Sequence, residues 1–233
     1  MIAETIIVRI VNYHSFIIHF LGGGSMSALL ISYTAGELMA KRVKDSERDK
    51  MLKAILWINI INIILCTSSG ANASAVFGIG IGMIFSGNFL FAFMLIILGA
   101  VLYFNQNLIE QLIMFIMPGK TRADIETSTG RERIWEVILE LAKQKPWFGW
   151  GFGCVERVAS DTGKIGFSVP DAHNNYIGFY GSLGYIGCFI AFIHFISSWF
   201  YSFRRRMRVG YTGLIAAVSC AIMNGYSYAF LCE

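Results

Sequence analysis

The sequence predicts an all-α membrane protein, a polytopic transmembrane helical bundle of about six spans with one large extracytoplasmic loop that contains an amphipathic helix. Of the 233 residues, 55% are hydrophobic and only 15% are charged, and the mean hydropathy is +0.58. These values exclude disordered, collagen-like and disulfide-stapled chains. A spanning helix needs about 20 apolar residues, and six segments qualify, at roughly 17–40, 52–68, 71–86, 88–104, 176–200 and 209–230.

The third and fourth apolar segments are short. Residues 71–104 therefore also fit a re-entrant pair of helices. Glycines make the third segment thin, which suits close packing against other helices; they are Gly78, Gly80, Gly82 and Gly87.

Lysine and arginine gather in two runs, at 41–53 and 204–208. Four predicted spans separate the runs, so both lie on one side, which the positive-inside rule assigns to the cytosol. The net charge of +4 is therefore interpreted as a sign of membrane sidedness and not of nucleic-acid binding. The predicted organisation is four spans in 1–104, an extracytoplasmic catalytic-type loop at 105–175, and two C-terminal spans in 176–233.

The five cysteines show no CxxC or Cys/His spacing, so neither a metal site nor a disulfide is indicated. We expect no metal and no cofactor. Residues 1–16 lack the pattern of a cleaved signal peptide, a basic region followed by an apolar core and small residues.

The loop contains one predicted helix. Thr129 is placed to be its N-cap, with Glu132 three residues later completing a capping box. The helix should run from there to about Lys143. Its apolar residues recur at helical spacing and form one stripe, and we expect the helix to lie on the membrane surface; the stripe is Ile134, Trp135, Ile138, Leu141 and Ala142.

A glycine-rich turn with four aromatic rings follows, Pro146-Trp147-Phe148-Gly149-Trp150-Gly151-Phe152-Gly153. Such rings pack either on lipid headgroups or on the faces of sugars. The interfacial interpretation is the stronger of the two, and both stay open here.

The sequence Asp171-Ala172-His173-Asn174-Asn175 stands immediately before an apolar span. The imidazole of His173 takes up a proton near neutral pH, and Asp171 is placed to orient it. Asn174 and Asn175 suit binding of sugar hydroxyls or capping of the next helix. Arg131 supplies a permanent charge that pairs well with phosphate oxygens.

Each of these residues also has a structural interpretation. The whole segment before the span fits a plain N-terminal capping sequence. Arg131 fits a solvated charge on the first turn of a helix, although a cation opposes the helix dipole there.

These motifs together resemble the O-antigen ligase/polymerase family, and in particular its C-terminal part. The resemblance rests on order and spacing and is best over residues 60–200. The matching pieces are Ser128-Thr129-Gly130-Arg131, Ile134-Trp135, the aromatic turn, Ala172-His173-Asn174-Asn175-Tyr176 and Leu183-Gly184-Tyr185-Ile186-Gly187.

The resemblance implies a glycosyltransferase of the bacterial cytoplasmic membrane. Such an enzyme takes a glycan from an undecaprenyl diphosphate carrier and transfers it to a sugar hydroxyl, without a metal. By position, His173 would be the base and Arg131 would hold the diphosphate or glycan. The substrate-binding candidates are Asn174, Asn175, Trp135, Arg133 and Asp171. The implied partners are the lipid-linked donor, a glycan acceptor, the bilayer and other polysaccharide-assembly proteins.

Two other function classes also fit parts of the sequence. One is a truncated, non-catalytic membrane protein or an assembly partner in polysaccharide export. The segment 67–71 favours it, because it has no arginine where family members usually carry a Ser-Arg pair. The other is a small-solute transporter, which ranks low because Glu37 is the only acid well inside a predicted span.

Overall fold

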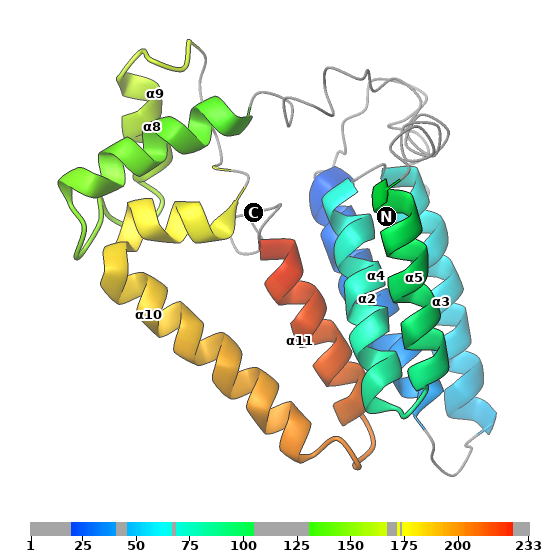
Figure 1. The fold of residues 1–233 in the computed structure, drawn as a ribbon. Coiled ribbons are helices and arrows are strands. Elements are labelled where there is room, and N and C mark those ends of the chain that lie inside the picture. Colours follow the sequence, from blue (N-terminus) through cyan, green and yellow to red (C-terminus); the bar gives the residue numbers. More distant parts are fainter. Residues whose placement is uncertain are drawn as a thin grey trace. The chain divides into compact units, whose positions relative to one another are not determined.

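The computed structural model describes residues 20–40, 46–66, 69–104, 131–166, 172 and 174–225. This part of the chain forms helices and no strand, so the all-α prediction is confirmed there (Figure 1). The helices are α2 (Phe20–Met39), α3 (Ser46–Cys66), α4 (Ser69–Phe85), α5 (Phe89–Phe104), α8 (Arg131–Gln144), α9 (Val155–Asp161), α10 (Asn175–Arg204) and α11 (Tyr211–Gly225).

Six of these helices lie at the six predicted apolar segments. Among the described helices, α10 is the one long and apolar enough to cross a membrane by length and composition. Shorter apolar helical stretches occur at Gly70–Phe85, Phe89–Leu98 and Tyr211–Gly225. The number of spans therefore stays a prediction.

Contacts divide the described helices into two compact units. The bundle unit contains α2 to α5, α11 as far as Asn224, and α10 from Ser198 onward. The loop unit contains α8, α9 and α10 as far as Ser197. The loop unit thus combines described residues of the predicted loop with most of the helix that follows it.

Small residues bring α2, α4 and α11 close together in the bundle unit. A Cβ added at Gly78 would lie 2.4 Å from the Ser32 hydroxyl oxygen and 2.8 Å from the Ala216 carbonyl oxygen. A Cβ added at Gly82 would lie 3.2 Å from the Cα of Gly36. The close packing predicted for this glycine-rich segment is confirmed at these two positions, where backbones approach too closely for larger side chains.

A buried carboxylate, Glu37, joins the end of α2 to the start of α11. It accepts hydrogen bonds from the backbone N–H groups of Gly210 and Gly213, both at 2.8 Å, and it forms an ion pair with Arg48 of α3. A helix N-terminus carries unpaired N–H groups and partial positive charge, so an anion is stabilising there. Glu37 therefore connects three helices of the bundle unit at one point.

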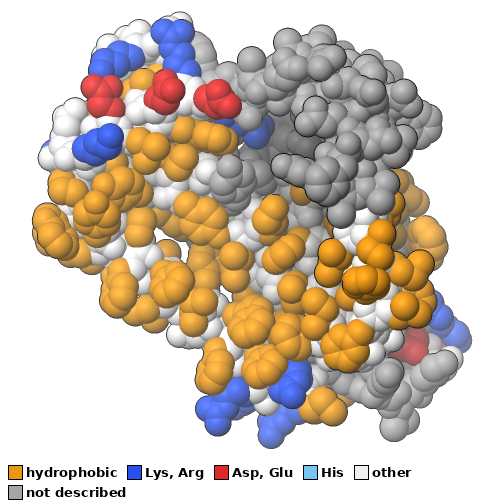
Figure 2. Space-filling model, viewed as in Figure 1, with side chains coloured by type: hydrophobic (Ala, Val, Ile, Leu, Met, Phe, Trp, Pro, Cys, Tyr) orange, Lys and Arg blue, Asp and Glu red, His pale blue; other side chains and the backbone are white. Residues whose placement is uncertain are grey.

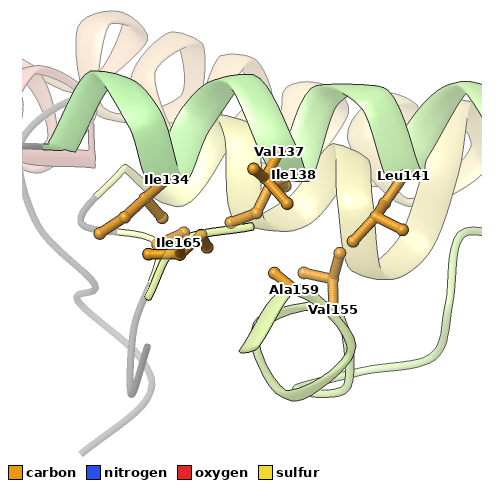
Figure 3. Packing of buried hydrophobic residues seen from close by; sticks show 8 residues of the cluster. Ile134, Val137, Ile138, Leu141, Val155, Ala159 and Ile165 are labelled. Carbon is orange, nitrogen blue, oxygen red and sulfur yellow. The ribbon is translucent and has the colours of Figure 1, made fainter. Parts of the chain in front are cut away.

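The loop unit is built around the apolar face of α8. Figure 3 shows this face turned toward α9 and the segment after it. A Cβ added at Gly181 of α10 would lie 2.8 Å from both Ile138 and Val155, so α10 also packs closely here. The buried residues of the cluster are Ile134, Val137, Ile138, Leu141, Val155, Ala159, Ile165 and Ala172.

The predicted helix and its stripe are largely confirmed in α8. Val137 is buried, whereas Trp135 lies half-buried at the edge of the cluster. The stripe packs against other parts of the protein, and the place of the helix on the membrane surface stays a prediction. The stripe is buried because α9 and α10, which follow α8 in the chain, supply its apolar partners. Thr129, the predicted N-cap, lies outside the described residues.

The helix α10 consists of two segments joined by a break at Gly184. This residue has φ 65° and ψ −162°, a conformation that glycine adopts and other residues rarely do. In an unbroken helix, the two N–H groups after the break would donate to the carbonyls of Gly181 and Ser182. Neither bond forms, so two donors and two acceptors need other partners.

The turn after α8 provides these partners. We call Pro146–Gly153 the aromatic turn. Its carbonyls accept from the two freed N–H groups, and its own N–H groups donate to the two freed carbonyls. The four bonds run from Tyr185 N–H to Pro146 O (2.8 Å), Ile186 N–H to Trp147 O (3.3 Å), Trp150 N–H to Gly181 O (3.0 Å) and Gly151 N–H to Ser182 O (2.8 Å).

Glycines allow the two backbones to meet. A Cβ at Gly149, which has φ 66°, would lie 2.3 Å from the carbonyl carbon of Ser182. A Cβ at Gly184 would lie 2.4 Å from the carbonyl carbon of Trp147. The aromatic turn and the break in α10 therefore form one rigid junction, which we call the backbone junction.

Candidate functional site

The two candidate arginines lie on the first turn of α8. Arg131 begins the helix and is partly buried, while Arg133 is exposed. Acidic and basic side chains gather over α8 in Figure 2, and the Glu140 carboxylate on this face pairs with Lys164 at 2.7 Å. A cation at a helix N-terminus opposes the helix dipole. The helix dipole therefore does not stabilise the charge of Arg131 at this position.

Trp135 links α8 to the segment before α10. Its indole N–H donates to the carbonyl oxygen of Ala172 at 2.8 Å. Ala172 is itself buried in the core of the loop unit. The backbone immediately before position 173 is therefore held from the second turn of α8, one helical turn away from Arg131.

Asn174 is the N-cap of α10. Its side chain is 3% exposed, and its Oδ1 accepts from the backbone N–H groups of Tyr176 at 3.0 Å and Ile177 at 3.2 Å. Of the two roles that the sequence left open for this residue, capping is thus observed. Asn175, the first residue of the helix, is partly buried.

His173 and Asp171 lie outside the described residues. The neighbours of position 173 are nevertheless each held by a hydrogen bond, Ala172 by Trp135 and Asn174 by its capping of α10. The structure thus brings together Trp135 and the residues that flank His173.

Glu156 is a residue that the sequence analysis did not single out. A Cβ added at Gly178, in the first turn of α10, would lie 3.5 Å from a Glu156 carboxylate oxygen and 3.5 Å from the Cβ of Ala172. A partly buried carboxylate of α9 therefore stands beside the start of α10. No motif in the sequence marks it, because its neighbours come from a segment about 20 residues later.

The described residues contain no group of three or more His, Cys, Asp or Glu side chains that could hold a metal ion. The carboxylates of α8 are spread along an exposed face, and one of them is paired with Lys164.

Comparison with known proteins adds the family. The family model described as O-antigen ligase matches residues 54–192. This range is more than half of the chain and includes every candidate site residue, from Arg131 to Asn175. The comparison with curated proteins gave no match. The chain therefore belongs to the O-antigen ligase family, whose members act in polysaccharide biosynthesis on lipid-linked glycan and acceptor substrates and are typically inner-membrane proteins.

Proposed function

We propose that the protein is a metal-independent glycosyltransferase of the bacterial cytoplasmic membrane. It transfers or polymerises glycan from an undecaprenyl diphosphate carrier onto a sugar hydroxyl, on the outer face of the membrane, where residues 105–175 lie. One observation carries the proposal. The helix that begins with Arg131 also holds the backbone beside His173, through the bond from Trp135 to Ala172.

In the proposed reaction, the acceptor hydroxyl oxygen attacks the anomeric carbon of the donor sugar. A new C–O bond forms, and the bond from that carbon to the diphosphate oxygen breaks. His173 takes the hydroxyl proton, and undecaprenyl diphosphate leaves with the electron pair. Arg131 stabilises the charge on the departing diphosphate, so cationic stabilisation and positioning are the main requirements.

The remaining candidates have supporting roles. Trp135 and Asn174 act as positioning residues, because each holds backbone next to His173. Asp171 orients the imidazole. Arg133, which is exposed, and Asn175 are the proposed contacts for glycan hydroxyls or phosphate.

A second candidate function is a non-catalytic assembly partner in polysaccharide export. A specific feature of the bundle unit favours it. Ala71, in the segment where family members usually carry an arginine, is 1% exposed and packs against α2 and α3. This position of the core therefore supplies no arginine that could bind a diphosphate.

The experiment gives membranes that contain the protein an undecaprenyl diphosphate-linked oligosaccharide and follows longer or transferred glycan on a gel. Wild type should form product, and His173→Ala should form none at equal membrane levels. Arg131→Ala should lower turnover about 100-fold, the usual loss when a group stabilising developing charge is removed. Arg157→Ala, which removes an exposed arginine of α9, is the matched control and should retain turnover.

The outcomes test the two residues and then the two candidate functions. Product from His173→Ala at the wild-type rate would remove the proposed base. Arg131→Ala with the turnover of Arg157→Ala would remove the proposed anchor. A folded wild-type protein that forms no product would favour the assembly partner.

A further inference from the structure

The aromatic turn exposes three large rings within six residues. Trp147, Phe148 and Phe152 are 64%, 74% and 66% exposed. Trp150 differs, because its indole N–H donates to the carbonyl of Leu141 at 2.9 Å and the ammonium of Lys145 lies 4.0 Å from its ring centre. Burying one such ring from water contributes roughly 1.5–3 kcal/mol. Three of them gathered in one short turn indicate a binding surface.

The backbone junction fixes where these rings stand. The turn is hydrogen-bonded to both sides of the break in α10, and the Trp147 ring packs edge-on against Tyr185, with ring centres 5.8 Å apart. The exposed rings therefore belong to a rigid structure at the start of the long segment of α10.

That segment continues the exposed apolar surface. Exposed hydrophobic residues occur at every turn of this segment and form a broad apolar face. This face belongs to the helix that is long and apolar enough to cross a membrane, and hydrophobic side chains cover the visible part of α10 in Figure 2. The exposed large hydrophobic residues from 185 to 196 are Tyr185, Ile186, Phe189, Ile190, Phe192, Ile193 and Ile196.

The charge of the aromatic turn also fits a lipid surface. Residues 143–153 contain Lys143 and Lys145 and no acidic residue. Aromatic rings next to lysines, at one end of an apolar helical face, are the composition that proteins use at the headgroup level of a bilayer. A sugar platform needs no continuity with a spanning helix.

We propose that the aromatic turn docks on the lipid surface, with Trp147, Phe148 and Phe152 among the headgroups and upper acyl chains. The proposal goes beyond glycan transfer, because it needs only that α10 crosses the bilayer. Docking sets the height of α8 above the membrane, since the aromatic turn begins two residues after that helix ends. The diphosphate of a lipid-linked donor lies at this same surface, so the height determines whether α8 reaches it.

The test uses the full chain in nanodiscs of phosphatidylethanolamine and phosphatidylglycerol. Phe148→Cys, in a background whose five cysteines are replaced, carries a polarity-sensitive dye. Lipids with a nitroxide at the headgroup, high on the chain or deep in the chain report its depth. Glu136→Cys, on the exposed face of α8, is the matched control. Phe152→Cys is a second site that leaves Trp147 and Phe148 in place.

We expect the dye at 148 and at 152 to emit at shorter wavelength than at 136. The headgroup and shallow nitroxides should quench it most, because an interfacial group sits about 5–10 Å into the boundary region. A dye at both sites that behaves as at 136 would overturn the proposal. Short-wavelength emission without nitroxide quenching would also overturn it, because protein and not lipid would then cover the turn. None of these readouts depends on glycan transfer, so this proposal and the proposed function fail separately.

Discussion

The break in α10 and the start of α11 are two places where helical backbone loses its regular hydrogen bonds, and the protein satisfies them differently. At the break, another stretch of backbone supplies both donors and acceptors. At the start of α11, a single buried carboxylate, Glu37, accepts from two N–H groups and pairs with Arg48. The first solution depends on glycines and the second on a charge.

The difference has physical consequences. Four neutral backbone bonds each contribute about 0.5–1.5 kcal/mol, and they form only if the two backbones approach without side chains between them. Hydrogen bonds to a charged group contribute about 1.5–3 kcal/mol each, and they are lost when the charge is removed. Substitutions that add a methyl group should therefore damage the backbone junction, and substitutions that remove charge should damage the Glu37 contact.

The largest effect is expected from Gly149→Ala. The added Cβ would lie 2.3 Å from the backbone of Ser182, so the aromatic turn must move and its bonds to α10 must weaken. We expect a loss of about 3–5 kcal/mol, measured by thermal or denaturant unfolding in detergent.

Gly153→Ala is the matched control for that variant. Gly153 has a similar φ, 64°, but a Cβ there would meet nothing within 4 Å. Only the backbone strain remains, about 1–2 kcal/mol. Equal losses for the two variants would mean that close approach to α10 does not matter.

A smaller effect is expected from Glu37→Gln. The amide keeps one acceptor oxygen but loses the charge that faces the start of α11 and Arg48. We expect a loss of about 2 kcal/mol in the free energy of unfolding. Glu47→Gln removes the same charge from a pair with Lys50 in which Glu47 is 85% exposed, and it should cost less than about 1 kcal/mol. Similar losses for Glu37→Gln and Glu47→Gln would show that burial does not strengthen the contacts of Glu37.

These two regions also show how far the sequence alone can reach. The apolar segments and the α8 stripe follow from composition and helical spacing, which are local, and their helices were placed correctly. The break at Gly184 was not predicted, because Leu183-Gly184-Tyr185 reads as part of one apolar span. Its cause lies in the aromatic turn, more than 30 residues earlier.

Local features were predictable in the candidate site too, and long-range contacts were not predictable there or in the bundle unit. Capping by Asn174 was one of two local interpretations, and its hydrogen bonds confirm it. The contact of Trp135 with Ala172 crosses 37 residues, and that of Glu37 with Gly210 crosses 173. Such partners depend on tertiary packing and leave no periodic signal in the sequence.

Trp135→Phe tests whether a backbone contact matters for transfer. It removes the indole N–H that bonds to Ala172 and should cost about 1 kcal/mol of stability. Turnover should fall by more than the loss of folded protein explains, because the backbone beside His173 loses its hydrogen bond. Trp150→Phe removes an equivalent bond, to Leu141, and should cost similar stability with wild-type turnover. If both variants lose turnover equally, Trp135 has no special positioning role.

The smallest effect is expected from substitutions of Asn174, and they separate capping from substrate binding. Asn174→Ala removes the cap of α10 and should lower stability by about 1 kcal/mol. Asn174→Asp keeps an acceptor for the N–H groups of Tyr176 and Ile177, so stability should return to the wild-type value. Turnover should return with it, because Asn174 is 3% exposed and its Oδ1 accepts hydrogen bonds from its own helix. An aspartate variant that is stable but inactive would show that the amide N–H group contacts the glycan, and Asn174 would then be a substrate-binding residue as well as a cap.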